Sequence, residues 1–402
     1  MKTVITGASG FVGRNLVSLL SADGVELLLA GRDAGRLADL FPGHETCDYE
    51  ALPARAVGYG AMIHLAVANN NSGLTEAAFF EANVELLERL ARCAAKAGIS
   101  YFVNVSSVHA LDDRDQSAYA HSKREGATRL AAFRSLDSFT VYLPLVYGDG
   151  WSGKLGFLNR LPKPLARSLF RILKALKATV HVSQVADLVK ADAAVPSQGN
   201  LILSDGQRDS LVFQATKRLI DLIFAISIIV FFWWLLGLVW IAIRLHSPGP
   251  GLFRQTRVGQ GGRPFTCYKF RTMKQGTAQA GTHEVSAVAV TDGFGSFLRR
   301  SKLDELPQIF NILRDEISLV GPRPCLPVQV ELVEARRQRV VLEVKPGITG
   351  LAQIEGIDMS DPHRLASRDA DYVALQSLSL DLSILVATGL GRGQGDKIVN
   401  TG

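Results

Sequence analysis

A long stretch without a charged side chain, residues 222–243, constrains this chain more than any other feature. About 20 consecutive apolar residues form a helix that can cross the hydrocarbon core of a bilayer. Buried helices of soluble proteins rarely stay uncharged for so long and usually keep a polar face. We therefore predict a membrane helix. It lies in an anchoring segment, 211–250, between an N-terminal part, 1–210, and a C-terminal part, 251–402.

The composition excludes several classes of protein. The 402 residues are 47% hydrophobic and 20% charged, which suits two or three globular domains with one membrane segment. The net charge of +6 fits anionic lipid headgroups or phosphorylated substrates. No run of basic residues with interleaved aromatics supports binding of RNA or DNA, so we predict no nucleic-acid partner. The four cysteines form no C-x-x-C pair, which excludes a zinc site and a disulfide framework.

The N-terminal part opens with a glycine-rich motif between a strand and a helix. Residues 2–6 read as a buried strand, TGASGFVG follows at 6–13, and leucines recur at helical spacing over 14–21. Glycines there let the chain turn tightly and let a pyrophosphate approach the helix N-terminus. A simple tight turn is the alternative, but the context favours a dinucleotide site. The expected cofactor contacts are Gly7, Gly10, Phe11, Val12, Gly13, Arg32 and Asp48.

The end of the second predicted strand bears on the choice of cofactor. Residues 26–30 lead into Gly31-Arg32-Asp33. An arginine suits the 2′-phosphate of NADP, whereas a carboxylate suits the ribose hydroxyl of NAD. Arg32 favours NADP slightly, Asp33 keeps NAD open, and a solvent-facing Arg32 is the alternative. Further strands are expected at 61–65 and 101–105, with Asn83 capping a helix over 84–97 that Gly98 ends.

Ser107 closes the strand at 101–105, and Tyr119 and Lys123 follow one helical turn apart. Side chains at i and i+4 share a helix face. A nearby ammonium lowers the pKa of a tyrosine, so the pair can move protons beside a hydride carrier.

Residues 1–205 resemble an extended short-chain dehydrogenase/reductase of the nucleotide-sugar epimerase/dehydratase type. The matching segments are TGASGFVG, IHLA, NVSS, YAHSK, LPLVYGDG and HVSQVADL. The resemblance implies a Rossmann-like, doubly wound parallel α/β sheet, with Ser107, Tyr119 and Lys123 as catalytic residues. The chain departs from the family in a short segment before Tyr119, in Leu143 where an arginine is common, and in a short segment after Gly148. A cofactor-binding scaffold without turnover therefore stays open.

The C-terminal part begins with a turn and a basic segment. SPGPG, at 247–251, ends the apolar helix because proline disfavours helix and glycine permits the turn. Over 253–259 and 268–273 basic residues alternate with aromatic and apolar ones. An ordinary lipid-facing basic patch accounts for much of that pattern.

Paired carboxylates follow at Asp304 and Glu305. Leu303, Leu306, Phe310 and Leu313 recur at helical spacing, and Pro307 places the carboxylates near a helix start. Two carboxylates beside Arg299, Arg300 and Lys302 could hold Mg²⁺ and a diphosphate. Routine helix capping is the alternative that the residue types alone favour.

The ordered segments of this region resemble the bacterial sugar transferases, the monotopic phosphoglycosyl transferases that start glycan assembly on a polyprenol carrier. The segments are SPGPGLFRQTRVG, YKFRTM, LDELPQIFNIL, SLVGPRP, PGITGLAQ and LSLDLSIL, within 216–388. The resemblance implies a mainly α catalytic domain that transfers a phosphosugar from a UDP-sugar to undecaprenyl phosphate. Asp304 would be the nucleophile, and Glu305 would assist with Mg²⁺ and protons. Arg299 and Arg323 would hold phosphates, and Lys345 would help.

The course of the membrane helix stays open between re-entrant and spanning. The family commonly breaks this helix with Ser-Pro, whereas here Trp233 and Trp234 occupy that place and no proline occurs between 219 and 247. Both halves need cytosolic nucleotides and basic residues flank both ends, which favours a re-entrant helix. We expect a bacterial inner-membrane protein with both catalytic domains facing the cytoplasm. Leu351 and Ile357 depart from the family, so the sugar is not predicted.

The whole sequence predicts a fused membrane enzyme whose N-terminal half makes, alters or presents the UDP-sugar that the C-terminal half uses. Its expected partners are that UDP-sugar, undecaprenyl phosphate and membrane lipids, and a homodimer is left open. One alternative is a transferase with a non-catalytic scaffold in front. Another is a membrane interaction protein in which both halves have lost activity.

Overall fold

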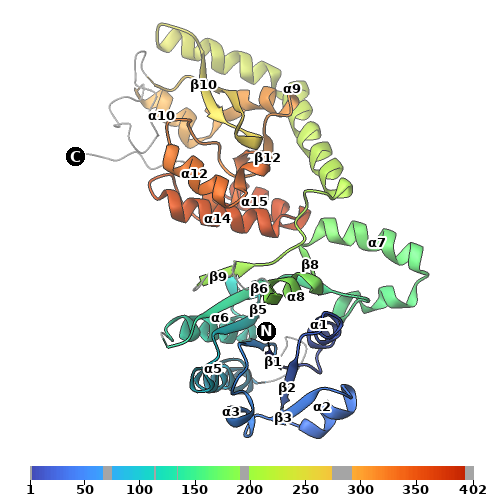
Figure 1. Ribbon diagram of the computed structural model, residues 1–402. Helices are drawn as coiled ribbons and strands as arrows, with labels where there is room; N and C mark the ends of the chain where they lie inside the picture. Colours follow the sequence, from blue (N-terminus) through green and yellow to red (C-terminus); the bar gives the residue numbers. More distant parts are fainter. Residues whose placement is uncertain are drawn as a thin grey trace. The chain divides into compact units, whose positions relative to one another are not determined.

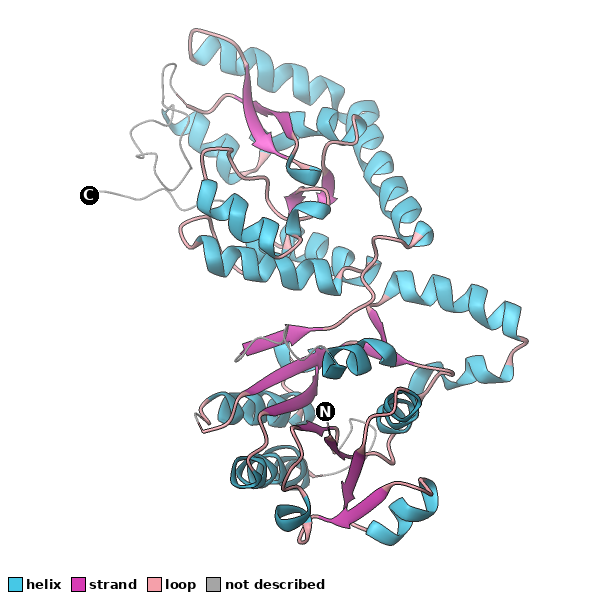
Figure 2. Cartoon of the chain, in the orientation of Figure 1, coloured by secondary structure: helices cyan, strands magenta, loops and turns pink. Residues whose placement is uncertain are grey.

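The computed structural model describes residues 2–66, 75–112, 115–133, 135–190, 199–273 and 292–393. The chain forms two compact units (Figures 1 and 2). The first unit comprises Met1–Phe170 and Ala178–Asp205, and the second comprises Arg171–Lys177 and Gly206–Gly402.

A seven-stranded parallel sheet, in the order β3-β2-β1-β4-β5-β6-β9, forms the centre of the first unit. The order reverses between β1 and β4, the position at which doubly wound sheets bind ligands. This confirms the predicted Rossmann-like fold. The strands are β1 (Thr3–Thr6), β2 (Leu27–Gly31), β3 (Glu45–Asp48), β4 (Ala61–His64), β5 (Tyr101–Ser107), β6 (Ser138–Leu143) and β9 (Gly199–Ile202).

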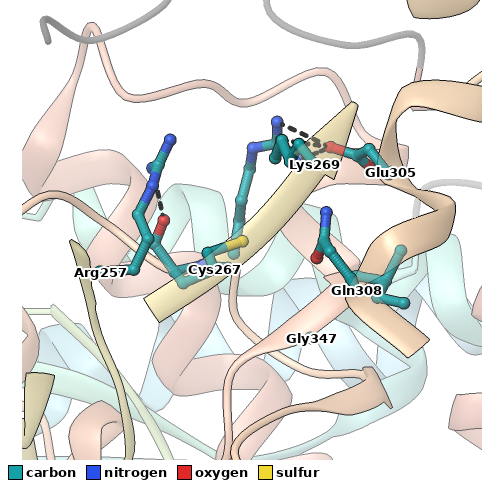
Figure 3. A pocket seen from close by; sticks show the side chains of 9 residues that line it. Arg257, Cys267, Lys269, Glu305, Gln308 and Gly347 are labelled. Carbon is teal, nitrogen blue, oxygen red and sulfur yellow. Dashed lines mark hydrogen bonds and ion pairs between the residues drawn. The ribbon is translucent and has the colours of Figure 1, made fainter. Parts of the chain in front are cut away.

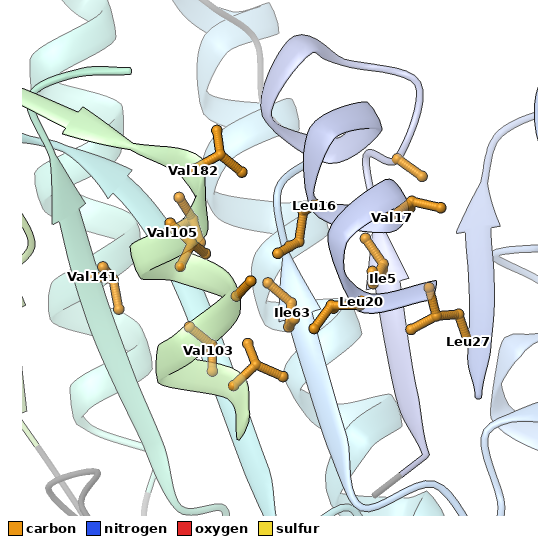
Figure 4. Close-up of a cluster of buried hydrophobic side chains, with 14 of the residues drawn as sticks. Ile5, Leu16, Val17, Leu20, Leu27, Ile63, Val103, Val105, Val141 and Val182 are labelled. Atoms are coloured by element: carbon orange, nitrogen blue, oxygen red, sulfur yellow. The ribbon is translucent and has the colours of Figure 1, made fainter. Parts of the chain in front are cut away.

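Helices cover both faces of this sheet because its strands are apolar on both sides. On one face, Leu16 and Leu20 of α1 pack against Ile5 and Ile63, beside Val182 at the start of α8 (Figure 4). Leu87, Leu90 and Ala94 of α5 cover the other face. The helices are α1 (Phe11–Ala22), α2 (Ala34–Leu40), α3 (Leu52–Arg55), α4 (Glu76–Phe80), α5 (Leu86–Ala97), α6 (Ala118–Ala131), α7 (Lys163–Leu176) and α8 (Val182–Lys190). Short turns η2 (Val108–Leu111) and η3 (Gly153–Arg160) and a strand pair, β7 (Leu145–Tyr147) and β8 (Thr179–His181), complete it.

The prediction that Asn83 caps a helix is wrong. The helical segment already begins at Glu76, and Asn83 lies in the π-helical turn η1 (Glu81–Glu85) between α4 and α5. Asn83 is buried, and its Nδ2 donates a hydrogen bond to Ser122 Oγ on α6 at 3.0 Å. Packing against a distant helix therefore outweighed the local capping preference of asparagine. Gly98 does end α5, with a left-handed φ of 73°.

The apolar stretch forms α9 (Leu211–His246), a helix of 36 residues with a break at Phe232. Phe232 has φ −124° and ψ 17°, and Figure 1 shows two arms that meet at a bend. The indole of Trp234 donates a hydrogen bond to the carbonyl of Phe231 at 3.0 Å. A side chain that satisfies a carbonyl at the break lets a helix bend without proline.

Both arms of α9 pack against the same unit. Ala225 of the first arm lies in a buried cluster with Ile309 and Ile312. Val239 and Ile243 of the second arm pack with Phe270 and Leu298. Many apolar side chains of α9 stay exposed. By length and composition the helix could cross a membrane. The exposed side chains include Ile223, Phe224, Ile226, Val230, Phe231, Phe232, Trp233, Trp234, Leu238 and Ile241.

The rest of the second unit is mixed, with mainly helical segments around two small sheets, as the fold class predicted. β10 (Leu252–Val258) and β11 (Pro264–Phe270) are antiparallel, and β12 (Ser318–Val320) and β13 (Gly347–Thr349) are parallel. The helical segments are η4 (Gln260–Gly262), α10 (Asp292–Arg300), η6 (Leu303–Gln308), α11 (Ile309–Leu313), α12 (Val330–Gln338), η7 (Val341–Glu343), α13 (Leu351–Ile354), α14 (Pro362–Leu375) and α15 (Leu378–Gly389).

Candidate active sites

The paired carboxylates lie on η6, which β11 holds in place. Lys302, immediately before η6, has a left-handed φ of 57°, so the chain turns sharply there. Asn311 is fully buried, and its Nδ2 donates to Thr266 O at 2.6 Å while its Oδ1 accepts from Tyr268 N at 3.1 Å. These bonds fix the end of the LDELPQIFN segment to β11 and bring Asp304 and Glu305 towards that strand.

Glu305 is held as a carboxylate by two cations from other segments. Lys269 Nζ on β11 lies 2.7 Å from Glu305 Oε1, and Arg323 Nη2 lies 3.4 Å from the same oxygen. Burial alone would raise its pKa, but Lys269 and Arg323 outweigh burial and hold the pKa of Glu305 at about 2. Glu305 therefore stays charged throughout the physiological range.

The pKa of Asp304 is shifted in the opposite direction from that of Glu305. Burial and the neighbouring Glu305 charge raise the pKa of Asp304 to about 6, although Lys269, Arg299 and Arg323 oppose that rise. Within the described residues Asp304 accepts no hydrogen bond that would satisfy its charge. Two adjacent carboxylates with separated pKa values are typical of active sites, where one group stays charged and the other reacts.

A pocket opens beside Glu305 and is lined by residues from β10, β11, η6, the segment after β12, and β13 (Figure 3). In Figure 3 the Lys269 side chain on the strand points towards Glu305, and Gln308 lies below them. The lining is mainly polar and cationic, which suits a phosphorylated ligand. The lining residues are Arg257, Cys267, Lys269, Glu305, Gln308, Arg323, Pro324, Gly347 and Ile348.

Three glycines bring the GPRP and PGITG segments into backbone contact. A Cβ on Gly347 would lie 2.1 Å from Gly321 N, and one on Gly350 would lie 2.3 Å from Gly321 O. Without side chains, Gly321 N donates to Thr349 O and Gly347 N donates to Pro322 O, both at 2.9 Å. These glycines position Arg323 beside Glu305, a role that we did not predict from the sequence.

The predicted phosphate-binding residues do not all meet at the pocket. Arg323 lines it, and the charge of Arg299 reaches Asp304 and lowers its pKa. Lys345 instead forms an ion pair with Asp315 at 2.6 Å and is absent from the pocket lining. The structure thus brings Arg299 and Arg323 to the carboxylates and places Lys345 on another partner.

The interpretation of the basic segment as a lipid-facing patch is wrong for Arg257 and Lys269. Arg257 is 9% exposed and donates to the carbonyl of Pro324 at 2.8 Å, while Lys269 pairs with Glu305. On a strand, alternate residues face opposite sides, so alternation of basic and apolar residues also fits a buried polar site. The alternation of basic and apolar residues was the feature of the sequence that could have indicated this buried site.

For Mg²⁺, the residues present fit a site of few protein ligands. Mg²⁺ is usually bound by one or two carboxylates together with substrate phosphates, and Asp304 and Glu305 supply two. No group of three or more His, Cys, Asp or Glu side chains suited to a metal occurs among the described residues. A substrate diphosphate would therefore have to complete the coordination.

In the first unit the glycine motif has the geometry of a nucleotide turn. Gly7 has φ 77°, and a Cβ there would lie 2.5 Å from the backbone of Ala66. A Cβ on Gly13 would lie 2.5 Å from Gly7 O, so this glycine lets α1 pack on the strand end. Gly10 caps α1 without a side-chain hydrogen bond, and Phe11 and Val12 begin the helix. The first backbone N–H groups of α1 are thus available to a phosphate.

The acidic residues near the second strand are engaged by the backbone of α2. Asp33 caps α2 through a 2.9 Å bond from Arg36 N, and Asp48 Oδ1 accepts from Ala34 N at 2.9 Å. Arg32 is exposed beside them. Asp33 and Asp48 therefore stabilise the start of α2, whereas the Arg32 guanidinium is accessible to a ligand.

Ser107, Tyr119 and Lys123 lie together at the end of β5 and on α6. The Ser107 side chain acts to lower the pKa of Tyr119, and Lys123 follows Tyr119 one turn later on α6. Burial lowers the pKa of Lys123 to about 7, and burial raises the pKa of Tyr119 against the effect of Ser107. The expected lowering of the tyrosine pKa is not present, because burial of the phenol dominates.

Comparison with known proteins gives two family matches. The bacterial sugar transferase model matches residues 212–391, and the NAD dependent epimerase/dehydratase model matches residues 3–191. An uncharacterized sugar transferase, EpsL, of Bacillus subtilis is 40% identical over 43% of this chain and 84% of its own length. A UDP-glucose:undecaprenyl-phosphate glucose-1-phosphate transferase of Xanthomonas campestris is 40% identical over 44% of this chain, which spans only 39% of that relative.

Among solved structures, MoeE5 in complex with UDP-glucuronic acid and NAD matches 51% of this chain and 77% of its own, at 21% identity and a TM-score of 0.41. The two family matches confirm the predicted fusion of an epimerase/dehydratase domain with a sugar transferase domain.

Proposed function

This chain belongs to the bacterial sugar transferase family, and we propose that it transfers a phosphosugar from a UDP-sugar to undecaprenyl phosphate. The product would start a bacterial glycan. The observation that carries the proposal is Asp304, a buried carboxylate without a hydrogen bond in the described structure, surrounded by Lys269, Arg299 and Arg323. The name of the Xanthomonas relative describes the same reaction with UDP-glucose.

In the proposed mechanism a carboxylate oxygen of Asp304 attacks the sugar-bearing phosphorus of the UDP-sugar. The bond from that phosphorus to the bridging oxygen breaks, and UMP leaves with the electron pair. An oxygen of undecaprenyl phosphate then attacks the phosphorus of the aspartyl ester and releases the Asp304 carboxylate. Lys269 and Arg323 keep Glu305 charged and stabilise phosphate oxygens, while Asp304 and Glu305 would hold Mg²⁺. When bound, Mg²⁺ neutralises charge on the diphosphate.

The test is UMP release by detergent-solubilised protein with undecaprenyl phosphate, Mg²⁺ and a panel of UDP-sugars. Asp304→Asn should lower the rate by roughly 10³-fold or more, as for other nucleophiles. Asp315→Asn is a matched control, because Asp315 lies outside the pocket and its φ of 63° suits asparagine equally. Near-full activity of Asp304→Asn would refute the assignment of the nucleophile.

We further propose that α9 enters the membrane and returns to the face it came from, so that both catalytic units lie on the cytoplasmic side of a bacterial inner membrane. The support is the break at Phe232 and the packing of both arms on one unit. A straight helix of 36 residues would be about 54 Å long, too long for its ends to reach the same small domain.

For the first unit we propose binding of NAD or NADP at the glycine turn, with Ser107, Tyr119 and Lys123 acting on a nucleotide sugar. The accessible Arg32 favours NADP slightly. The alternative is a cofactor-binding scaffold, which the raised pKa of Tyr119 favours. Loss of sugar redox or epimerase turnover in Tyr119→Phe would support the enzyme, and absence of turnover in the unaltered protein would support the scaffold.

A further inference from the structure

Arg271 has a buried guanidinium with hydrogen-bond donors that are not used. It is 7% exposed, and its Nη2 donates to the carbonyl of Ser247 at 2.7 Å. Its Nε and Nη1 are buried and have no hydrogen-bond partner among the residues that the structure describes. Leaving charged donors buried and unpaired is costly. An anion bound there would satisfy these donors and the charge together.

The position of Arg271 connects the catalytic carboxylates to the membrane helix. Arg271 lies two residues after Lys269, just beyond the end of β11, and Lys269 contacts Glu305. In the other direction, Arg271 N donates to Gly251 O at 3.0 Å, and Ser247 is the last cap residue of α9. Arg271 does not line the pocket of Figure 3. It therefore marks a second place for an anion, on the side where α9 ends.

Arg299 supplies a second unused donor in the same region. Its Nη1 is buried without a hydrogen-bond partner in the described part of the chain, and its charge opposes the rise in the pKa of Asp304. Leu298 and Phe270, the chain neighbours of Arg299 and Arg271, belong to one buried cluster with Leu303. The segments that carry Arg271 and Arg299 therefore pack together through Phe270 and Leu298, and the charge of Arg299 acts on the nucleophile.

We propose that Arg271, together with Arg299, binds the phosphate group of the acceptor lipid, while the pocket lined by Lys269 and Arg323 takes the nucleotide sugar. This inference rests on the proposed transferase function. Arginine presents a planar fork of donors that matches phosphate oxygens. The end of an apolar helix is the place at which the phosphate of a membrane lipid, and not that of a soluble nucleotide, would arrive. From this position an acceptor oxygen could attack the Asp304 phosphosugar ester, whose carboxylate then leaves.

The decisive experiment separates the two half-reactions. In Arg271→Gln, the burst of UMP released without acceptor should stay within about threefold of the unaltered protein, because the nucleotide site is intact. The KM for undecaprenyl phosphate should rise by roughly tenfold to a hundredfold, the usual effect of lost hydrogen bonds to a charged group. The KM of Arg271→Lys should lie between those of Arg271→Gln and the unaltered protein. Arg254→Gln, an exposed arginine on β10, is the matched control and should change neither half-reaction.

A direct binding measurement keeps the inference testable even if no transfer is found. Asp304→Asn protein should bind a fluorescent polyprenyl phosphate, and adding Arg271→Gln should weaken that binding at least tenfold. If Arg271 serves only to hold Ser247, the UMP burst and the melting temperature will fall together with acceptor use, which would overturn the proposal. So would an unchanged KM and unchanged binding.

A last comparison distinguishes an acceptor lipid from a bulk phospholipid headgroup. Rates are measured in vesicles with increasing phosphatidylglycerol at constant undecaprenyl phosphate. The proposal expects Arg271→Gln and the unaltered protein to share the same dependence on phosphatidylglycerol. If the variant alone loses that dependence while keeping its KM for undecaprenyl phosphate, Arg271 binds a bulk phospholipid and the proposal is wrong.

Discussion

At the scale of single residues, the adjacent carboxylates differ because their surroundings differ. Glu305 receives the cations of Lys269 and Arg323 directly, whereas Asp304 is buried next to the charge of Glu305. A shift of one pKa unit corresponds to about 1.4 kcal/mol between the two protonation states. Ionising the proposed nucleophile Asp304 therefore costs free energy in the folded protein. Forming the phosphosugar ester removes that negative charge and with it the cost.

The first prediction concerns the pH dependence of transfer. Because the nucleophile must be a carboxylate, kcat/KM should fall as the pH decreases through about 6, the pKa of Asp304. Lys269→Gln removes a cation that lowers this pKa, so its acidic limb should shift upward by about one unit. A pH–rate profile of both proteins with saturating Mg²⁺ checks this. An acidic limb that does not move in Lys269→Gln would contradict the electrostatic assignment.

The second prediction concerns stability. The folded-state pKa of Asp304 is raised above its unfolded value of 3.8, so its charge destabilises the fold above about pH 6, and this effect disappears below about pH 4. Asp304→Asn should therefore stabilise the second unit by about 1–3 kcal/mol at pH 8, with no gain at pH 4. Thermal unfolding in detergent at both values measures it. Equal stability of the two proteins at pH 8 would show that the charge of Asp304 does not destabilise the fold.

At the scale of elements, α9 shows how a helix can break without proline. Trp234 satisfies the carbonyl of Phe231 at the break, and the second arm is held by Trp240, whose ring lies against Gly251. A Cβ on Gly251 would lie 2.6 Å from that ring, so the turn after α9 depends on a glycine there. Trp233 and Trp234 thus occupy the place at which the family commonly has Ser-Pro.

The third prediction tests the course of this helix. Leu211 and Leu245 lie at its two ends and are each 84% exposed, and the four native cysteines are all buried. Cysteine at either position should react with a membrane-impermeant maleimide from the same side of inverted vesicles. Labelling of Leu211→Cys and Leu245→Cys from opposite sides would show a spanning helix. The background labelling of the four buried native cysteines is read from the unaltered protein.

The fourth prediction concerns the contact between β12 and β13. Gly347→Ala would place a Cβ 2.1 Å from Gly321 N, and because that neighbour is backbone it cannot move aside locally. We expect a loss of roughly 1–3 kcal/mol and displacement of Arg323, with reduced UMP release. Gly389→Ala, in α15 with no atom within 4 Å of the added Cβ, should be neutral. Similar stability of the two variants would refute the close contact as a requirement.

At the scale of the whole molecule, each unit has its own buried core and its own candidate site. Linking two activities raises the effective concentration of one product at the next site. It does not require that the chemistry of one unit depend on the other. We therefore expect that transfer from a supplied UDP-sugar is independent of cofactor binding.

The fifth prediction tests that independence. A Cβ on Gly10 would lie 3.4 Å from Gly7 O, a tolerable contact, but it would stand where a pyrophosphate approaches α1. Gly10→Ala should weaken NADH or NADPH binding by about tenfold while UMP release stays unchanged. Fluorescence titration measures the first quantity, and Gly35→Ala in α2 is the control. A matching fall in UMP release would show that the cofactor unit controls the transferase.

The sequence by itself determined what depends on neighbouring residues. Strand, glycine turn and helix over 2–21 predict the nucleotide turn, because the close approach of Gly13 to Gly7 O lies within that short segment, whereas the approach of Gly7 to Ala66 joins it to the end of β4. The apolar run of α9 and the adjacency of Asp304 and Glu305 are likewise local facts. Family resemblance then extended these facts to a domain order and to a reaction.

Only the tertiary structure decided the properties that depend on distant segments. The pairing of Lys269 with Glu305 joins residues 36 positions apart, and it determines which carboxylate stays charged. Asn83 became a buried partner of Ser122, and Arg271 came to lie between the site and the end of α9. Burial and charge depend on everything that packs around a group, and local patterns of residues do not contain that information.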